Sequence, residues 1–455
     1  MNITAFSMTP LFKDRVMGGA QKQLYVVMMH LAEQGHNVTV LCTRREPDAT
    51  EAFMWHENAR VVPIFRFKQP YPEPYATPIY NIASAIQDIG EYLATADVFY
   101  SHDGGFIFPY IYQTVPTVTS LRSVLFAETL QSAYLFQGDD LILISNYQRD
   151  VILATVGRFF PDLAARIHVI YNGLDFDTFK PSPTDDIRQH IPQVDPAEHA
   201  IALYPHRPER EKGILEVIET ANLLVHEHGI GNLRVLVPRW IESALSPGDK
   251  AFYDDVTGRI ERYGLTENFV FHQWVSQTLM PQYYSLGAVT FAIGSYVETF
   301  GNVPYESLAC GTPSIVARVG PARELLPEGL IEKVDFGDVQ AAAQIAARII
   351  KNGERTKPET LIDLQARFKR EDMVQAYANI ILNATKRDPM PYMHRPLSPQ
   401  GHFVQSPWVY TANGRQYHDF TEQYRSDADI AGDEMMNLYR DGWVVPVQDG
   451  EGGTA

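Results

Sequence analysis

The hydrophobic pattern of the first forty residues changes between strand and helix periods. Apolar positions run through 2–6, and after a glycine-containing loop they recur at helical spacing over 20–34, where Gly35 ends the pattern. The apolar face of this predicted helix consists of Leu24, Val27, Met28 and Leu31. The next apolar run, over 37–41, predicts a buried strand. The first segment therefore predicts a strand–helix–strand unit of a parallel sheet.

Apolar runs of strand length return along the chain and alternate with segments of helical spacing. In the first half they predict strands at 98–100, 117–119 and 141–144, and a helix that begins near Ser145. In the second half they predict strands at 200–204, 233–237, 269–271 and 289–291, and helices at 213–227, 252–263 and 368–383. This alternation favours a doubly wound α/β architecture in both halves.

A turn-rich stretch from Asn172 to Phe179 separates the halves, and an aromatic segment follows the second half. In that segment, 410–417 predicts a hairpin over the Asn413-Gly414 turn, and 428–439 predicts a helix. The segment is too aromatic for a disordered tail. We therefore expect domains at 1–178 and 179–384, and an extension of unknown role at 385–455.

Composition limits the function classes. The 455 residues are 45% apolar and 20% charged, with a net charge of −17, so the overall field repels nucleic acid and anionic lipid. The only cysteines, Cys42 and Cys310, lie in predicted apolar elements, which argues against a disulfide framework and favours a cytoplasmic location. No run of about 18 apolar residues predicts a transmembrane segment, and the first residues lack the pattern of a signal peptide.

The stretch Val297–Pro313 places two glutamates, Glu298 and Glu306, around a glycine-led helix start. Within it, Asn302 is the predicted N-cap, Pro304 is tolerated in the first turn, and Gly311 suits a left-handed stop. The backbone N–H groups of a helix start favour an anion. The sequence therefore predicts an anion-binding helix terminus flanked by carboxylates.

Cations and glycines elsewhere in the chain could serve the same ligand. Arg207 and Lys212 follow a predicted strand and precede a helix start, and Arg210 competes with them for the same role. Near the amino terminus, Gly18-Gly19-Ala20 offers small residues that let backbone N–H groups approach a diphosphate. This glycine pair lacks the G-x-G-x-x-G spacing, which weakens a nicotinamide-cofactor interpretation.

These motifs together resemble the retaining glycosyltransferases of the GT-B fold, the glycosyl transferases group 1 set that includes glycogen and sucrose-phosphate synthases. The E-x7-E spacing alone is weak, because Glu211 and Glu219 share it. The Phe-Gly-Asn that follows Glu298 raises the specificity. The stretch 172–179 is similar to the family's interdomain segment, and 207–212 is similar to its R-x4-K pair. The resemblance covers about residues 1 to 384 and implies two Rossmann-like domains that face a cleft.

The resemblance implies a role for each motif residue. Arg207 and Lys212 would hold the phosphates of a nucleoside diphosphate sugar, and Glu306 would hold its ribose hydroxyls. Glu298 would contact the sugar, and Gly18 and Gly19 would contact the diphosphate. The donor would also be bound by Phe300, Gly301 and Asn302. The family also implies retention of the anomeric configuration without a protein nucleophile, metal ion or cofactor. The donor would be the partner, and the acceptor, a glycan, lipid or small molecule, stays undetermined.

Besides Arg207, Lys212 and Glu298, the expected catalytic residues include His102 of the first domain, and this domain also departs from the family pattern at one position. His102 follows a predicted strand and so lies at the carboxyl edge, where α/β sheets bind ligands, although a structural histidine is equally consistent with this position. Arg122 stands where relatives carry a second histidine, which puts a mechanism based on that imidazole in doubt. Arg122 is instead a candidate for binding an anionic acceptor.

Other functions remain open at this point. A glycosidase needs a proton-donating acid opposite a second carboxylate, whereas Glu298 and Glu306 share one helix start beside predicted cations. The acidic pairs Asp139-Asp140 and Asp175/Asp177 lack a convincing set of metal ligands. A nucleotide-sugar epimerase and a non-catalytic binding or scaffold protein on the same fold are the alternatives.

Overall fold

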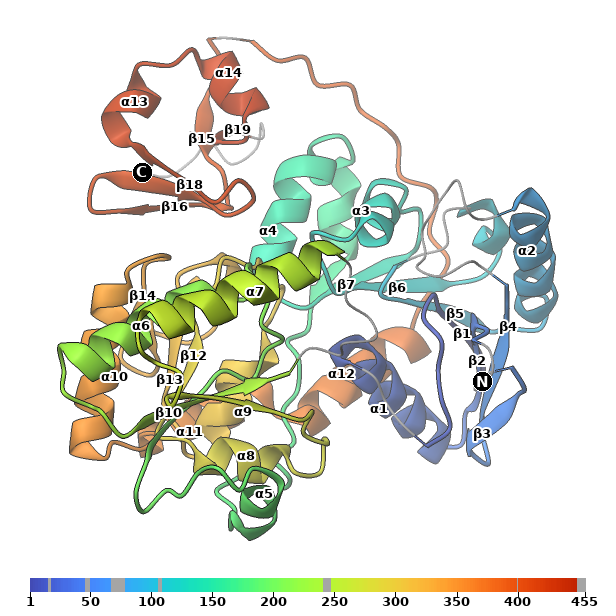
Figure 1. Cartoon of the computed structure of the whole chain (residues 1–455). Helices are drawn as coiled ribbons and strands as arrows, with labels where there is room; N and C mark the ends of the chain where they lie inside the picture. Colours follow the sequence, from blue (N-terminus) through green and yellow to red (C-terminus); the bar gives the residue numbers. More distant parts are fainter. Residues whose placement is uncertain are drawn as a thin grey trace. The chain divides into compact units, whose positions relative to one another are not determined.

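The computed structural model describes residues 1–14, 18–45, 50–66, 78–104, 109–239, 247–398 and 400–447 (Figure 1). Its contacts divide the chain into two compact units. Unit 1 comprises Met1–Gly173, Glu371–Val409 and Asp427–Ala455, and unit 2 comprises Leu174–Arg370 and Tyr410–Ser426. The extension is therefore shared between the two units.

Unit 1 contains an eight-stranded sheet in the order β3-β4-β2-β1-β5-β6-β7-β8. Its strands are β1 (Asn2–Ser7), β2 (Asn37–Thr43), β3 (Phe53–His56), β4 (Ala59–Phe65), β5 (Val98–His102), β6 (Thr117–Leu121), β7 (Asp140–Leu143) and β8 (Ile167–Val169). All neighbouring pairs are parallel except β3 and β4. The helices are α1 (Gly19–Glu33), α2 (Ile79–Leu93), α3 (Ala127–Tyr134), α4 (Asn146–Thr155) and α12 (Arg370–Leu382).

Successive residues of β1 face different cores, as the strand period requires. Ala5 packs with residues of α1 and α12, whereas Phe6 packs with residues of α2. Helices therefore cover both faces of this sheet. Because Met373, Tyr377 and Ile381 of α12 are buried in this core, residues 371–384 pack with unit 1, whereas the predicted ranges place them in the second domain.

Unit 2 contains a six-stranded parallel sheet in the order β11-β10-β9-β12-β13-β14. Its strands are β9 (Ala200–Leu203), β10 (Leu233–Pro238), β11 (Phe269–His272), β12 (Val289–Ala292), β13 (Ser314–Ala317) and β14 (Glu332–Val334). Its helices are α5 (Asp185–His190), α6 (Ile214–His226), α7 (Pro247–Arg262), α8 (Met280–Leu286), α9 (Asn302–Ala309), α10 (Val339–Asn352) and α11 (Pro358–Phe368). Val235 faces the core with α6 and Leu236 faces the core with α8, so this sheet is also covered on both faces.

The extension contains two small antiparallel sheets. One pairs β15 (Phe403–Gln405) with β19 (Val444–Pro446), and the other consists of β16 (Val409–Ala412), β17 (Arg415–His418) and β18 (Gln423–Ser426). Asn413 and Gly414 join β16 to β17 with positive φ angles of 53° and 71°, which confirms the predicted hairpin turn. The single helix predicted at 428–439 is wrong, because α13 (Asp427–Ala431) ends before Gly432 and α14 (Met435–Arg440) begins after it.

The two doubly wound α/β domains predicted from the hydrophobic pattern are confirmed. Within the described ranges, no helix is long and apolar enough to cross a membrane.

Candidate functional site

The predicted site residues follow strands that lie side by side where the strand order reverses. In unit 2 this switch point falls between β9 and β12, and in unit 1 it falls between β1 and β5. Open α/β sheets bind ligands outside the carboxyl ends of such strands. Arg207 and Lys212 follow β9 and Glu298 follows β12, so the tertiary structure brings two distant motifs to one sheet edge.

Two glycines lock the loop after β9 against the loop after β12. A Cβ on Gly294 would lie 2.3 Å from the Glu211 carbonyl oxygen, and a Cβ on Gly213 would lie 2.6 Å from the Gly294 nitrogen. Gly213 also has a φ of 86°, and the Tyr296 N–H donates to the Glu211 carbonyl over 2.8 Å. Only glycine permits this backbone approach, which sets the separation of Lys212 and Glu298.

Lys212 and Glu298 form an ion pair at this edge. Nζ of Lys212 lies 2.6 Å from Oε1 of Glu298 and 3.4 Å from the centroid of the Tyr296 ring. The lysine side chain is 18% exposed and the glutamate 42% exposed, so the pair adds little to stability but orients both groups. The result is a cation held beside a carboxylate that stays accessible to solvent.

Arg207 and Arg210 take different positions on the same loop. Arg207 is 64% exposed and its Nε lies 3.1 Å from Oε1 of Glu209. The Arg210 guanidinium carbon instead lies 5.2 Å from the centroid of the Phe252 ring on α7. Both arginines are exposed, Arg207 beside a carboxylate and Arg210 beside an aromatic ring.

The helix start of the glutamate motif differs by one residue from the prediction. Gly301, with a φ of 77°, is the N-cap of α9, and no side chain caps it. Asn302 is the first helical residue, so its predicted role as N-cap is wrong, because the left-handed backbone at the helix entry suits glycine. Gly311 ends the helix with a φ of 87°, as predicted.

A pocket of about 110 Å³ lies between this helix start and the ends of β12 and β13. Glu298, Gly301 and Asn302 line it, together with His206 and Tyr296, which the sequence analysis did not select. Burial and the Lys212 charge lower the pKa of His206 to about 3, so the imidazole is neutral near pH 7. Phe300 contributes to the lining and is itself 3% exposed, with its ring packed against Phe368.

Glu306 is not among the residues that line this pocket. Its Oε2 accepts a hydrogen bond of 3.1 Å from the hydroxyl of Tyr284 on α8. The side chain of Tyr284 is fully buried, and burial together with the Glu306 charge raises its pKa, so it remains a donor. The two glutamates therefore have separate surroundings.

In unit 1, the predicted loop leads into α1 at the switch point. Gly18 is the N-cap of α1, with a φ of 88°, and Gly19 is the first helical residue. His102 ends β5 and is 3% exposed. Its Nε2 lies 2.8 Å from the Ala20 carbonyl oxygen and its Nδ1 lies 2.8 Å from the Tyr100 hydroxyl. Both ring nitrogens are thus occupied, and the imidazole ties the start of α1 to β5.

Arg122 is held by two partners within unit 1. Its Nη1 donates to the Tyr377 hydroxyl over 3.1 Å, and its Nη2 donates to Oδ1 of Asn172. These bonds use two of the five N–H donors of a guanidinium. They connect the loop after β6 to α12 and to the start of the turn-rich stretch.

Sequence reasoning missed the residues that shape the pocket rather than bind charge. Gly294, Tyr296 and His206 carry no motif by themselves. Gly294 lies two residues after β12, and a glycine at a strand end is a known sign of close backbone approach. That signal was present in the sequence, whereas the role of Tyr296 depends on the position of Lys212.

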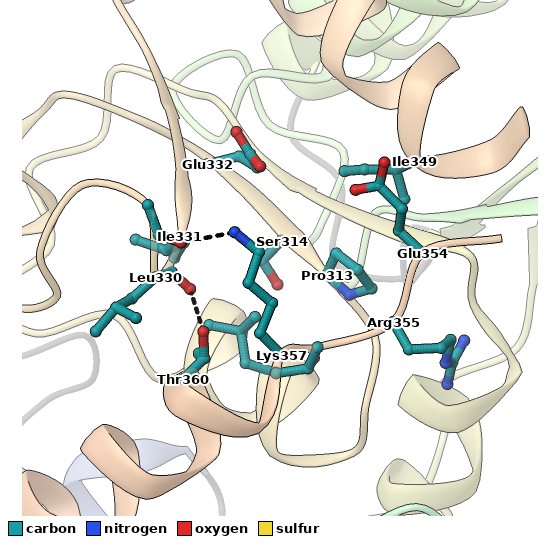
Figure 2. Close-up of a pocket in the computed structure, with 13 residues that line it drawn as sticks. Pro313, Ser314, Leu330, Ile331, Glu332, Ile349, Glu354, Arg355, Lys357 and Thr360 are labelled. Carbon is teal, nitrogen blue, oxygen red and sulfur yellow. Dashed lines mark hydrogen bonds between the residues drawn. The ribbon is translucent and has the colours of Figure 1, made fainter. Parts of the chain in front are cut away.

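A second pocket lies at the opposite edge of the same sheet (Figure 2). It is bordered by Pro313 and Ser314, where β13 begins, and by the segment that leads into α11. Lys357 donates to the Gly329 carbonyl over 3.0 Å and Thr360 donates to the Leu330 carbonyl over 2.8 Å. At about 30 Å³, it has room for only roughly two water molecules. We therefore place the candidate site at the carboxyl edge.

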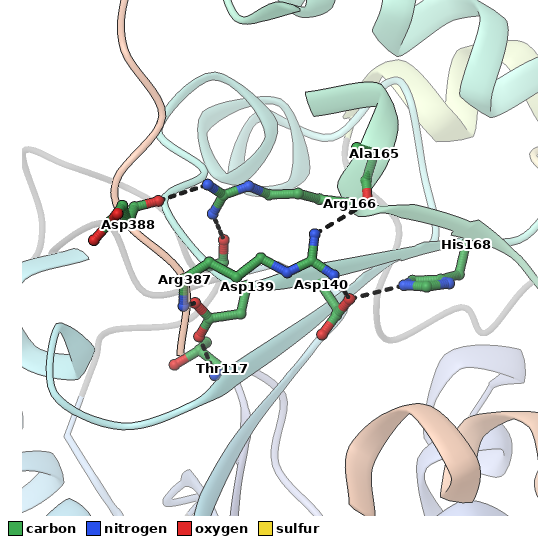
Figure 3. Close-up of polar contacts among 9 residues, drawn as sticks. Thr117, Asp139, Asp140, Ala165, Arg166, His168, Arg387 and Asp388 are labelled. Carbon is green, nitrogen blue, oxygen red and sulfur yellow. Dashed lines mark hydrogen bonds and ion pairs between the residues drawn. The ribbon is translucent and has the colours of Figure 1, made fainter. Parts of the chain in front are cut away.

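The acidic pair Asp139-Asp140 holds the segment after α12 in place (Figure 3). Asp139 is fully buried and accepts from the Thr117 N–H over 2.7 Å, from the Arg387 N–H over 2.6 Å and from Lys386 over 3.0 Å. Asp140 accepts from His168 over 2.8 Å. These carboxylates are thus engaged in anchoring the beginning of the extension.

Comparison with known proteins agrees with the fold. The family model described as Glycosyltransferase Family 4 matches residues 17–178, and the one described as Glycosyl transferases group 1 matches residues 186–362. Sucrose-phosphate synthase from Thermosynechococcus elongatus has a similar structure, with a TM-score of 0.67 and 18% identity over 83% of this chain and 98% of that one. Anabaena HepE in complex with UDP and glucose gives a TM-score of 0.64 and 20% identity, covering 84% and 99%.

The matches to sequence relatives cover a smaller share of the chain than the structural matches do. D-inositol 3-phosphate glycosyltransferase from Mycobacterium sp. (strain KMS) is 27% identical over 206 residues, which is 45% of this chain. The match spans 44% of the length of that relative. The protein of that name from Xylanimonas cellulosilytica is 25% identical over 235 residues, which is 49% of this chain and 53% of the relative.

The chain contains two doubly wound sheets, and in each of them loops with candidate ligand-binding residues follow the strands at the switch point. This arrangement defines a protein of the GT-B class. The matches to the two domain models identify the chain as a glycosyltransferase, and its residues 186–362 are similar to the group 1 set.

Proposed function

We propose that this protein transfers a sugar from a nucleoside diphosphate sugar to an acceptor, with retention of the anomeric configuration and without a metal ion. The observation that carries the proposal is the Lys212–Glu298 pair, which stands beside the N-terminal end of α9 and a pocket. A diphosphate at this edge would meet an ammonium group, and an attached sugar would meet a carboxylate. The similar HepE structure was solved with UDP and glucose, which supports a donor of this class.

The chemistry requires stabilisation of the negative charge that grows on the departing diphosphate. Lys212 is oriented before binding by Glu298 and Tyr296, so little reorganisation is needed when the charge develops. Arg207 is exposed and can add a planar fork that holds two phosphate oxygens. The N-terminal end of the α9 dipole adds a positive electrostatic potential, which favours the negative charge of the diphosphate. Together these groups would lower the barrier to cleavage of the bond between the sugar and the diphosphate.

The remaining donor contacts fall to the two glutamates. Glu298 keeps part of its carboxylate accessible and would accept hydrogen bonds from sugar hydroxyls. Glu306, oriented by Tyr284, would accept from the paired hydroxyls of a ribose. Retention would follow if the acceptor oxygen attacks the face from which the diphosphate leaves, with no covalent enzyme intermediate. His102, with both ring nitrogens occupied, would position the start of α1, and Arg122 stays a candidate for an anionic acceptor.

Incubation of the protein with UDP-, GDP- and ADP-sugars, with and without acceptors, tests the proposal. The acceptor panel includes D-inositol 3-phosphate and a sugar phosphate, because relatives and a structural neighbour carry names of this kind. Release of nucleoside diphosphate that depends on an acceptor supports transfer. Conversion of the donor sugar without an acceptor would establish an epimerase, and tight binding without turnover would establish a binding protein.

Two further measurements address the finer points. Nuclear magnetic resonance of the product reports its anomeric configuration, and an inverted product contradicts retention. Activity that persists in excess chelator supports metal independence, whereas activity that a chelator abolishes and Mg²⁺ restores contradicts it.

A further inference from the structure

The hairpin sheet β16–β18 of the extension packs on unit 2, although the segments that flank it pack on unit 1. This sheet lies beyond the residues that either family model matches, 17–178 and 186–362. The role of this sheet therefore has to be inferred from the residues of this chain. Its side chains contact the segment that forms the wall of the candidate pocket.

A buried ion pair joins the hairpin sheet to the segment that follows β13. Asp419, directly after β17, has a fully buried side chain, and its Oδ2 accepts from Nη2 of Arg323, which is 14% exposed. Arg323 ends the 3₁₀ helix η5 (Gly320–Arg323), and its Nε donates to the Gly320 carbonyl over 3.1 Å. The guanidinium carbon also lies 5.7 Å from the centroid of the Tyr410 ring. One side chain thus connects η5 with two parts of the hairpin sheet.

The η5 segment forms part of the pocket wall. Val319 and Ala322 line the pocket together with Glu298 and Gly301. Lys333 of β14 also holds this segment, because its Nζ donates hydrogen bonds of 2.7 Å to the carbonyl oxygens of Arg323 and Leu326. A shift of Arg323 would therefore move Ala322 in the wall.

The hairpin sheet also reaches the element that follows the Lys212 loop. The charge of Glu422, in the turn between β17 and β18, acts on Glu216 in the first turn of α6. Burial raises the pKa of Glu216, and the carboxylates of Glu219 and Glu422 raise it further. Tyr424 donates to the Phe336 carbonyl over 2.8 Å, and the ring of Tyr417 packs against Phe336 at 5.5 Å. The hairpin sheet thus spans from η5 to the start of α6.

We propose that Asp419 is a positioning residue for the donor pocket: through Arg323 it holds η5 in the wall that a nucleoside diphosphate sugar contacts. This inference rests on the proposed function, and it deepens it by making donor affinity depend on the extension. Loss of its charge would break the ion pair to a guanidinium that is only 14% exposed, and this change favours movement of η5 toward solvent.

The test compares full-length Asp419→Asn with wild type in titrations with UDP, GDP and ADP. Asp419→Asn is expected to raise the dissociation constant of the preferred nucleotide by at least about fivefold. The single variant Arg323→Gln and the double variant Arg323→Gln/Asp419→Asn are measured as well. The double variant should bind no more weakly than the weaker of the two single variants, because both substitutions break the same ion pair. Glu332→Gln, which removes an ion pair of 2.6 Å with Arg348 at the start of β14, is the matched control and should bind like wild type.

Hydrogen exchange provides a readout that does not require the nucleotide. Amides of 318–326 should exchange faster in Asp419→Asn than in wild type or Glu332→Gln, at temperatures where all three are folded. A variant with wild-type affinity and wild-type exchange in this segment overturns the inference alone. If wild type binds none of the three nucleotides, the proposed function fails, and this inference fails with it.

Discussion

Nζ of Lys212 lies 2.6 Å from Oε1 of Glu298, although the two residues are 86 positions apart in the chain. The contact exists because β9 and β12 are neighbours at the switch point and because Gly213 and Gly294 let the following loops touch. It couples the cation proposed for the phosphates to the carboxylate proposed for the sugar. Damage to either side should therefore affect both binding and transfer.

Lys212→Ala should lower the turnover number for transfer by about 100-fold or more, since it removes a cation from the departing diphosphate. The free energy of unfolding should change by less than about 1 kcal/mol, because the ion pair is partly exposed. Steady-state kinetics and thermal melting measure the two effects. Lys250→Ala, at an exposed position on α7, is the control and should leave both unchanged. Near-normal turnover in Lys212→Ala would refute the phosphate assignment.

Gly294→Ala should destabilise unit 2 by about 1–3 kcal/mol and weaken nucleotide binding, because the new methyl group meets backbone that cannot move aside. The Cβ would lie 2.3 Å from the Glu211 oxygen and 2.4 Å from the Lys212 carbonyl carbon. Gly231→Ala is the matched control, because a Cβ there meets no atom within 4 Å. Denaturant unfolding and calorimetric titration measure the effects, and equal behaviour of the two variants would contradict the locked-loop interpretation.

His102→Gln should reduce the dependence of stability on pH in weakly acidic solution. Burial, together with the Arg122 charge, lowers the pKa of His102 to about 3, whereas an unfolded histidine titrates near 6.5. Between these values only the unfolded chain binds the proton, so the wild type loses stability as the pH falls from about 6.5 toward 3.

The slope of unfolding free energy against pH, measured between pH 5 and 6.5, should be smaller in His102→Gln by at most about 1.4 kcal/mol per pH unit. His394→Gln, in an exposed part of the extension, is the control and should keep the wild-type slope. An unchanged slope in His102→Gln would show that the imidazole is not held neutral by its surroundings.

Asp139→Asn should destabilise unit 1 by about 3 kcal/mol, because a fully buried carboxylate that accepts from two backbone N–H groups and a lysine is replaced by an amide. Asp388→Asn is the control, because the Asp388 side chain is exposed. Its backbone carbonyl oxygen accepts a hydrogen bond of 2.6 Å from Nη2 of Arg166, and the substitution leaves that oxygen in place. Chemical denaturation measures both variants. Limited proteolysis after residue 384 should accelerate only in Asp139→Asn, and equal rates would contradict an anchoring role.

Local pattern was sufficient for most of the fold. The apolar run at 37–41 and the helical spacing of 20–34 predicted elements that the structure confirms as β2 and α1. Period and length decide such elements, and neighbouring residues carry both. The split of 428–439 at Gly432 and the N-cap at Gly301 were missed, because glycine is compatible with many backbone conformations and the local pattern does not decide which one it adopts.

By itself, the sequence determined the doubly wound architecture, the helix start after Glu298 and the charged types available to a donor, because these depend on periodicity and on short motifs. Only the tertiary structure decided which of them meet. It paired Lys212 with Glu298, turned Glu306 toward Tyr284, and brought Asp419 against Arg323 beside the pocket wall. The physical reason is that strand order and close backbone packing set these distances, and neither is written in the local pattern of the chain.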